Sequence, residues 1–223
     1  MGKLYVVPTP IGNLRDITLR SLDVLKEVDT VLCEDTRRTR ILLNHYQIKG
    51  KKLMSYYEPK EERQIPKIIK LLREKDVALV SDAGMPAISD PGYRLIRRCI
   101  EEGIEVEVLP GPSALITALV GSGLPTDRFL FAGFPPRKGT RGFFKELAEC
   151  KDSTIVIYES PKRLLKTLNL IRETFGEVFL SVAREISKVH EEYIRGTVSQ
   201  VIEELESRGS VKGEVVVVFS RKR

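Results

Sequence analysis

Apolar and polar positions follow two different spacings along the first half of the chain. Short runs of apolar, often β-branched residues predict buried strands at 3–7, 30–33, 53–56, 77–80 and 104–109. Segments spaced for amphipathic helices follow them at 17–28, 36–46, 66–75, 90–102 and 113–120. Strands that alternate with helices in this rhythm are typical of βαβ units. The first half is therefore expected to form an α/β domain with a parallel sheet.

The alternation stops at the segment 121–125, Gly-Ser-Gly-Leu-Pro, which favours a domain boundary. Strands are predicted beyond it at 129–134, 154–158, 178–183, 192–195 and 215–219, and helices at 141–149, 160–174 and 197–207. A chain of 223 residues is long enough for two small domains. We expect an N-terminal α/β domain over 1–122 and a mixed α/β domain over 123–223, whose last strands can be antiparallel.

Local signals also predict where individual helices begin. Asp16 is available as the N-cap of the first helix. Asp90 followed by Pro91 predicts a helix start, because Asp suits the N-cap and Pro the first turn. Thr197 with Gln200 matches a capping box.

Composition narrows the class of protein. The chain is 42% hydrophobic and 30% charged, and its longest apolar run, Val215–Phe219, is far below the ~18 residues of a membrane span. The first residues lack the apolar length of a secretory signal, so a cytoplasmic protein without membrane contact is expected. Three scattered cysteines and two histidines disfavour a metal site or a disulfide framework. The scarcity of Asn, Gln, Met and Cys beside abundant Glu, Lys and Arg indicates a thermophilic source.

Three predicted loops at the carboxyl ends of strands have the composition of a ligand site. They span 8–14, 81–92 and 110–114 and are rich in Gly, Pro, Asp and Ser. Ser113 and Ala114 would sit at a helix N-terminus, where free N–H groups can hold a carboxylate. The dinucleotide-binding, Walker and hydrolase-elbow motifs are missing.

Several motifs resemble those of the RsmI family. They are Val7–Asp16, Cys33–Arg37, Ser81–Gly92, Leu109–Ala114, Tyr158–Pro161, Arg184-Glu185 with Lys188, and Lys212–Glu214. The resemblance implies the fold of the tetrapyrrole methylases, with two α/β domains and S-adenosylmethionine in the cleft between them. It also implies a homodimer and the 2'-O-methylation of a cytidine ribose in small-subunit (16S) ribosomal RNA.

Binding residues are expected in three groups. An apolar slot for the adenine of S-adenosylmethionine is predicted from Met85, Ala114, Tyr158 and Ala183, while Asp82 either meets a cationic part of the cofactor or braces its own loop. The full predicted cofactor set is Pro10, Asp82, Gly84, Met85, Pro112, Ser113, Ala114, Tyr158 and Ala183. The predicted RNA-binding residues, in line with a net charge of +6, are Arg37, Arg38, Arg137, Lys138 and Arg141.

Catalytic candidates follow a predicted buried strand. A ribose hydroxyl is a weak nucleophile, so a base or a charge stabiliser is expected to assist it. Arg184, Lys188 and Glu191 are the candidates, with Lys188 acting either as a cation or, if burial lowers its pKa, as a neutral base. The cluster Glu34–Arg38 is a second candidate. Two other functions stay open, a tetrapyrrole C-methyltransferase and a non-catalytic ribosome-binding protein.

Overall fold

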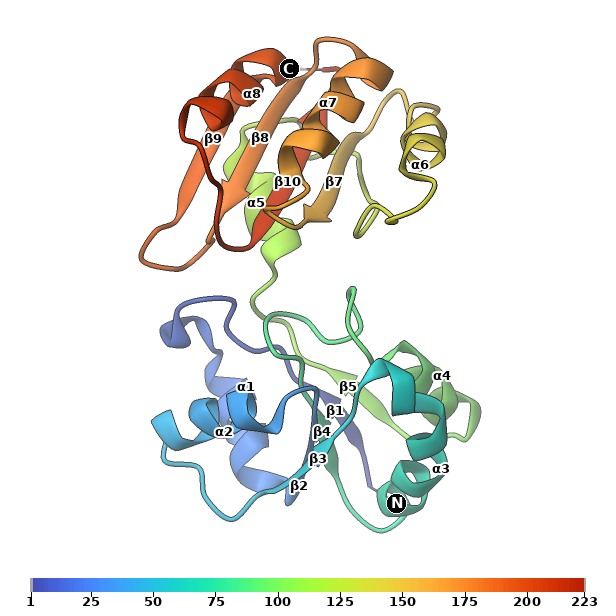
Figure 1. Cartoon of the computed structure of the whole chain (residues 1–223). Helices are drawn as coiled ribbons and strands as arrows, with labels where there is room; N and C mark the ends of the chain where they lie inside the picture. Colours follow the sequence, from blue (N-terminus) through green and yellow to red (C-terminus); the bar gives the residue numbers. More distant parts are fainter. Residues whose placement is uncertain (1, 223) are drawn as a thin grey trace. The chain divides into compact units, whose positions relative to one another are not determined.

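The structure is a computed structural model that describes residues 2–222, except for the side chain of residue 59. The chain forms two compact units, Met1–Ser113 and Ala114–Arg223 (Figure 1). The division falls before helix α5 (Ala114–Ser122), whereas the sequence placed the boundary after it. Helix α5 lies in the second unit because it packs on strands β10 (Val215–Ser220) and β8 (Phe179–Arg184).

The first unit is built on a parallel sheet with the strand order β3-β2-β4-β1-β5. The strands are β1 (Leu4–Val6), β2 (Thr30–Cys33), β3 (Lys52–Ser55), β4 (Val77–Leu79) and β5 (Val106–Val108). Strands β2 and β4 are buried throughout, as a parallel sheet covered on both faces requires. The parallel sheet predicted from the alternation is confirmed.

Helices cover both faces of this sheet. Apolar residues of α1 (Leu19–Glu27) and α2 (Thr36–His45) form one core cluster with the strands, and α3 (Glu61–Leu72) and α4 (Tyr93–Glu101) form another. Two short 3₁₀ turns, Leu14–Asp16 and Glu58–Lys60, precede α1 and α3. Asp16 lies in the first of these turns, so the N-cap of α1 is Thr18, whose side chain accepts the Ser21 N–H.

The predicted helix start at Asp90 is wrong. Helix α4 begins at Tyr93 with Gly92 as its N-cap, and the Gly92 N–H donates to Oε1 of the buried Glu61 at 3.2 Å. Gly92 has φ +141°, and a Cβ there would lie 2.9 Å from the Leu79 side chain. The carboxylate of Glu61 from α3 thus accepts an N–H at the start of α4, in the role that the sequence had given to Asp90.

The second unit has a mixed sheet with the order β6-β7-β10-β8-β9. Its remaining strands are β6 (Phe129–Phe131), β7 (Thr154–Glu159) and β9 (Glu192–Thr197). Only β6 and β7 pair in parallel among the described strands of this sheet, so the antiparallel pairing expected for the last strands is confirmed.

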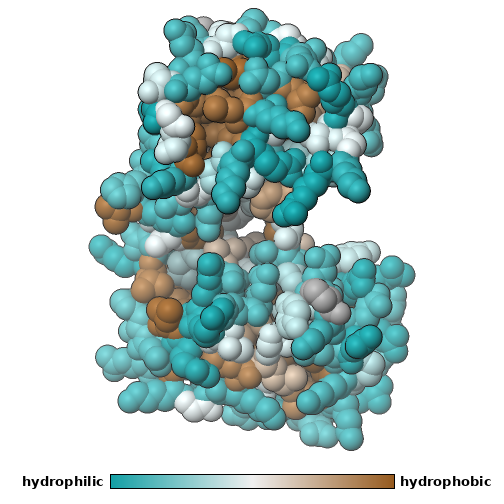
Figure 2. Space-filling model, viewed as in Figure 1, coloured by the Kyte–Doolittle hydropathy of each residue, from teal (hydrophilic) through white to brown (hydrophobic). Residues whose placement is uncertain are grey.

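Helices α6 (Thr140–Leu147), α7 (Leu164–Phe175) and α8 (Val198–Ser207) share the main apolar core with one face of this sheet, and α5 covers the other (Figure 1). The capping box of Thr197 and Gln200 is present at the start of α8. The face seen in Figure 2 is mostly hydrophilic, with apolar side chains gathered in patches. Among residues 2–222, no helix has both the length and the apolarity to cross a membrane.

Candidate functional site

Loops that follow β1, β4 and β5 meet at the carboxyl edge of the first unit's sheet. The backbones of Thr9 and Gly84 exchange two hydrogen bonds, at 2.9 and 3.0 Å. The Thr9 hydroxyl donates to the Ser81 carbonyl, and the Ser81 hydroxyl donates to the Gly84 carbonyl, both at 3.1 Å. Gly111 is required because a Cβ there would lie 2.4 Å from the Pro8 ring. The three loops are therefore joined by hydrogen bonds and close packing into one surface, at the edge where the sequence placed them.

Asp82 braces this surface against the loop after β2. Its Oδ1 accepts the backbone N–H of Asp35 at 3.0 Å, and its Oδ2 lies 3.6 Å from Nε of Arg38. Of the two roles that the sequence left open for Asp82, bracing is the one these contacts describe. The cluster Glu34–Arg38 is thereby joined to the Ser81–Gly92 loop.

Three carboxyl groups gather at this junction. Burial, followed by the negative charges of Glu34 and Asp82, raises the pKa of Asp90 to about 7, although a hydrogen bond with Ser81 opposes the rise. Burial and the charge of Asp82 also raise the pKa of Glu34. The sequence pattern around Asp90 indicated a helix cap and gave no sign of a titratable group. The raised pKa depends on the packing of the loop, which the sequence does not show.

Backbone strain marks the same loop. Ala87 and Ser89 have φ values of +69° and +62°, in the left-handed region that non-glycine residues rarely adopt. Such conformations persist where the surrounding structure imposes them, and they cluster at ligand sites. The Gly- and Pro-rich composition of the loop was the signal available in the sequence.

A small pocket lies beside these loops within the first unit. It has a volume of about 170 Å³ and is lined by Thr9, Pro10, Arg38, Ser81 and Asp82 together with apolar residues of α2. Two predicted cofactor-binding residues, Pro10 and Asp82, therefore lie together here. Gly84 lies next to the loop after β5, since a Cβ at Gly84 would be 3.7 Å from the Pro112 carbonyl oxygen.

The other predicted cofactor residues are distributed over both units. Met85 and Ser113 are partly exposed in the first unit, and Ala114 opens α5 in the second. Tyr158 is half-buried on β7 and packs edge-on against Phe131, with ring centroids 4.9 Å apart. Ala183 is fully buried within β8, so its methyl group is part of the core of the second unit.

Lys188 lies in the turn between β8 and β9, between two carboxylates. Its Nζ is 2.9 Å from Glu185 Oε1 and 3.2 Å from Glu214 Oε2. Glu185 Oε1 also accepts the Glu214 N–H at 2.8 Å. Burial lowers the pKa of Lys188, but the hydrogen bond to Glu185 and the charge of Glu214 raise it more, and the pKa lies above its ordinary value. Lys188 is therefore a fixed cation, and its alternative role as a neutral base is not supported.

The turn is strained and tied to the end of the chain. Glu185 and Ser187 have φ values of +50° and +66°. Arg184 donates from Nε to Glu192 at 2.5 Å and from a guanidinium nitrogen to the Lys212 carbonyl at 3.0 Å. The exposed Glu191 accepts the Ser187 N–H at 2.5 Å. The three catalytic candidates thus lie in one turn, but Arg184 and Glu191 hold its backbone, while Lys188 carries the partly exposed charge.

The predicted RNA-binding residues lie in two separate places. Arg37 and Arg38 are exposed in the first turn of α2, and Arg37 binds Asp35 through Nε at 3.0 Å and through a second nitrogen at 2.7 Å. This contact lowers the pKa of Asp35 to about 2. Arg137, Lys138 and Arg141 are exposed at the start of α6, where Arg141 lies 3.0 Å from Glu173.

Comparison with known proteins defines the class. The family model of tetrapyrrole (corrin/porphyrin) methylases matches residues 3–202, so the chain is a methyltransferase of that family. A crystal structure of diphthine synthase has the same fold, with a TM-score of 0.76 at 17% identity and with coverage of 98% of this chain and 90% of that one.

The narrower family follows from closer relatives. The chain is 59% identical to the ribosomal RNA small subunit methyltransferase I of Hydrogenobaculum sp., over 99% of this chain and 96% of the relative. It is 52% identical to the protein of the same name from Thermotoga maritima, over the whole of both chains. The chain belongs to the RsmI family, as its motifs predicted.

Proposed function

We propose that this protein transfers a methyl group from S-adenosylmethionine to the 2'-oxygen of a cytidine ribose in small-subunit ribosomal RNA. The observation that carries the proposal is the identity of 59% and 52%, over nearly the full length, with two relatives named ribosomal RNA small subunit methyltransferase I. The net charge of +6 fits a polyanionic substrate. The cytidine and its 2'-oxygen follow from the RsmI motifs of the sequence.

The loops of the first unit fit part of this cofactor. Glu34 supplies an acidic group suited to the ammonium or sulfonium charge, and Leu14, Ile41 and Leu42 give the nearby pocket an apolar side. The pocket volume of about 170 Å³ is below the ~300 Å³ of a typical ligand site, so it would hold only a portion of the molecule. Ala114 and Tyr158 remain the proposed contacts of the adenine ring.

Bound S-adenosylmethionine would supply an electrophilic methyl group. The protein then has to align the ribose hydroxyl and manage the charge that develops on its oxygen. Lys188, fixed by Glu185 and Glu214, is suited to stabilise that negative charge. Asp90, with its pKa raised to about 7, has the proton affinity expected of a general base at neutral pH.

We further propose that the protein acts in the cytoplasm as a homodimer on the small ribosomal subunit. Exposed apolar side chains of α5, Ile116 at 46% and Val120 at 68%, suit burial against a second copy. Sedimentation of the purified protein would measure this, and a monomer at micromolar concentration would contradict the homodimer.

One experiment tests the reaction itself. The protein is incubated with radiolabelled S-adenosylmethionine and small ribosomal subunits that lack the modification, and the labelled nucleotide is then identified by nuclease digestion and mass spectrometry. We expect label on the ribose of one cytidine. Label on a base, or label transferred only to an added tetrapyrrole, would refute the proposed substrate, and an absence of transfer would favour a non-catalytic role.

A further inference from the structure

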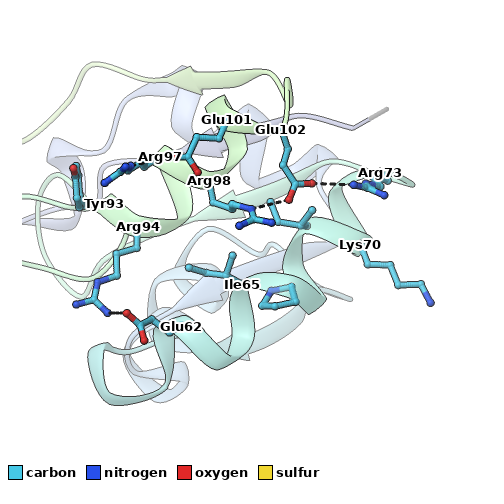
Figure 3. A pocket seen from close by; sticks show the side chains of 12 residues that line it. Glu62, Ile65, Lys70, Arg73, Tyr93, Arg94, Arg97, Arg98, Glu101 and Glu102 are labelled. Carbon is cyan, nitrogen blue, oxygen red and sulfur yellow. Dashed lines mark hydrogen bonds and ion pairs between the residues drawn. The ribbon is translucent and has the colours of Figure 1, made fainter.

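A groove of about 870 Å³ runs between helices α3 and α4 on the first unit (Figure 3). Its apolar side is formed by Ile65, Pro66 and Ile69 of α3. Charged side chains from both helices border it. None of the binding residues predicted from the sequence lines this groove.

The borders carry more positive than negative charge. Five basic residues line the groove against three glutamates. Arg94 pairs with Glu62, and Arg97 pairs with Glu101 at 2.9 Å, so these charges are balanced.

The excess charge lies at one end. Arg73 and Arg98 share a single carboxylate, Glu102, at 2.9 and 2.7 Å (Figure 3). Lys70 is exposed and has no ion-pair partner among residues 2–222. The side chains of Arg73 and Arg98 are 63% and 54% exposed, so the guanidinium N–H groups that do not bind Glu102 face solvent. This end is therefore suited to bind anions.

The opposite end offers an aromatic ring. Tyr93, the first residue of α4, is 63% exposed and lies one helical turn before Arg97. An exposed ring beside guanidinium groups is the combination on which unpaired nucleobases stack in single-stranded RNA. The groove thus offers aliphatic, aromatic and cationic surfaces, which match the sugars, bases and phosphates of a nucleotide chain.

The groove begins next to the candidate site. Helices α3 and α4 both start at the carboxyl edge of the sheet, where Glu61 of α3 binds the Gly92 N–H at the end of the Ser81–Gly92 loop. Tyr93 follows that loop directly. A strand bound in the groove would therefore continue toward the loops that we assign to the reaction.

We propose that the groove between α3 and α4 binds a single-stranded segment of the substrate RNA, with phosphates at Lys70, Arg73 and Arg98 and a base on Tyr93. The inference rests on the proposed function, because it assigns a second contact surface for the same RNA. It extends the RNA-binding residues predicted from the sequence, which lie elsewhere.

The test compares two variants that lose the same charge. Lys70→Gln with Arg73→Gln removes cations from the groove and leaves the Arg98–Glu102 pair intact. Lys26→Gln with Lys49→Gln removes two exposed cations on the α1 and α2 side of the same unit. Binding to a small-subunit RNA fragment and to whole small subunits is measured over a range of salt concentrations, together with methylation at saturating RNA. Tyr93→Ala is measured in the same way.

The groove variant is expected to bind RNA about tenfold more weakly, and the slope of log affinity against log salt should fall by about 1.4, as for two lost single-strand phosphate contacts. The rate at saturating RNA should be unchanged, and the control should bind as wild type. If the groove variant and the control variant have the same RNA affinity and the same salt slope, the proposed RNA binding in the groove is wrong, while the proposed methylation is unaffected. Normal binding to naked RNA with weakened binding to whole subunits would indicate a protein partner, which also overturns it. A wild-type protein that neither binds nor methylates RNA would overturn the proposed function and the groove together.

Discussion

The ammonium group of Lys188 lies 2.9 Å from Oε1 of Glu185, and that same oxygen accepts the backbone N–H of Glu214. One carboxylate oxygen thus fixes both the lysine and the segment that leads into β10. The backbone N–H of Glu214 and the Lys188 ammonium lower the pKa of Glu185, which keeps it ionised at neutral pH. The charge of Lys188 is therefore held in a defined position, as electrostatic stabilisation of a reacting oxygen requires.

Lys188→Met is expected to slow single-turnover methylation about a hundredfold, because it keeps the length of the side chain and removes the cation. Affinity for S-adenosylmethionine, measured by calorimetry, should stay within a few-fold. Lys188→Arg should recover part of the rate. A wild-type rate for Lys188→Met at saturating substrate would show that Lys188 is a structural charge and would direct attention to Glu34–Arg38.

Asp90→Asn is expected to change the pH dependence of both activity and stability. A general base acts when deprotonated, so wild-type methylation should rise with pH through about 7, and the variant should be slow and lack this rise. The folded state holds the Asp90 proton more tightly than the unfolded chain does, so this residue costs stability as pH rises from about 4 to 7.

The same substitution should therefore raise the free energy of unfolding at pH 8 by about 1 kcal/mol after allowance for partial exposure, with little change at pH 4. Urea titrations at the two pH values measure this difference. The exposed Asp127→Asn is a matched control that should alter neither profile. Equal effects on stability at both pH values would contradict the raised pKa of Asp90.

Ala114→Phe is expected to weaken S-adenosylmethionine binding at least tenfold, because a bulky ring at the start of α5 would fill the proposed adenine slot. Leu19→Phe, at an 80% exposed position of α1, serves as the matched control and should bind normally. Calorimetry gives both affinities, and circular dichroism checks that the variants fold. Unchanged affinity in a folded Ala114→Phe protein would remove Ala114 from the cofactor site.

Replacing Arg137, Lys138 and Arg141 together with glutamine is expected to weaken RNA binding and to reduce its salt dependence, because each phosphate contact contributes to the slope. The affinity for S-adenosylmethionine should not change. Neutralising Lys26, Lys49 and Lys52, which are exposed away from α6 and from the groove, controls for net charge. If the salt dependence of RNA affinity is the same in wild type and in the Arg137, Lys138 and Arg141 variant, these residues do not contact the RNA.

Glu61→Ala is expected to destabilise the protein by about 2 kcal/mol. It would leave the Gly92 N–H and the buried Tyr56 hydroxyl without their shared acceptor, Oε1 of Glu61. The neighbouring Glu62 is 75% exposed, and Glu62→Ala should cost less than about 0.5 kcal/mol. Chemical denaturation compares the two, and equal losses would argue against the capping role of Glu61.

Local patterns in the sequence were sufficient for the order and type of most elements. The alternation of strands and helices predicted the parallel sheet of the first unit, and the pair Thr197 and Gln200 predicted the start of α8. Gly- and Pro-rich loops predicted the surface that Thr9 and Gly84 join. These features depend on residues close together in the chain, where spacing and side-chain type carry the information.

Features set by distant residues were decided only by the tertiary structure. The carboxylate of Glu61 caps a helix that begins 32 residues later at Tyr93, Asp82 binds Asp35 across two strands, and burial beside Glu34 and Asp82 raises the pKa of Asp90. The sequence also could not assign α5 to the second unit, because the apolar residues of this helix do not indicate which sheet will bury them. A sequence encodes hydrogen-bonding capacity and apolar surface, but which groups meet, and how far they lie from water, depends on how the whole chain packs.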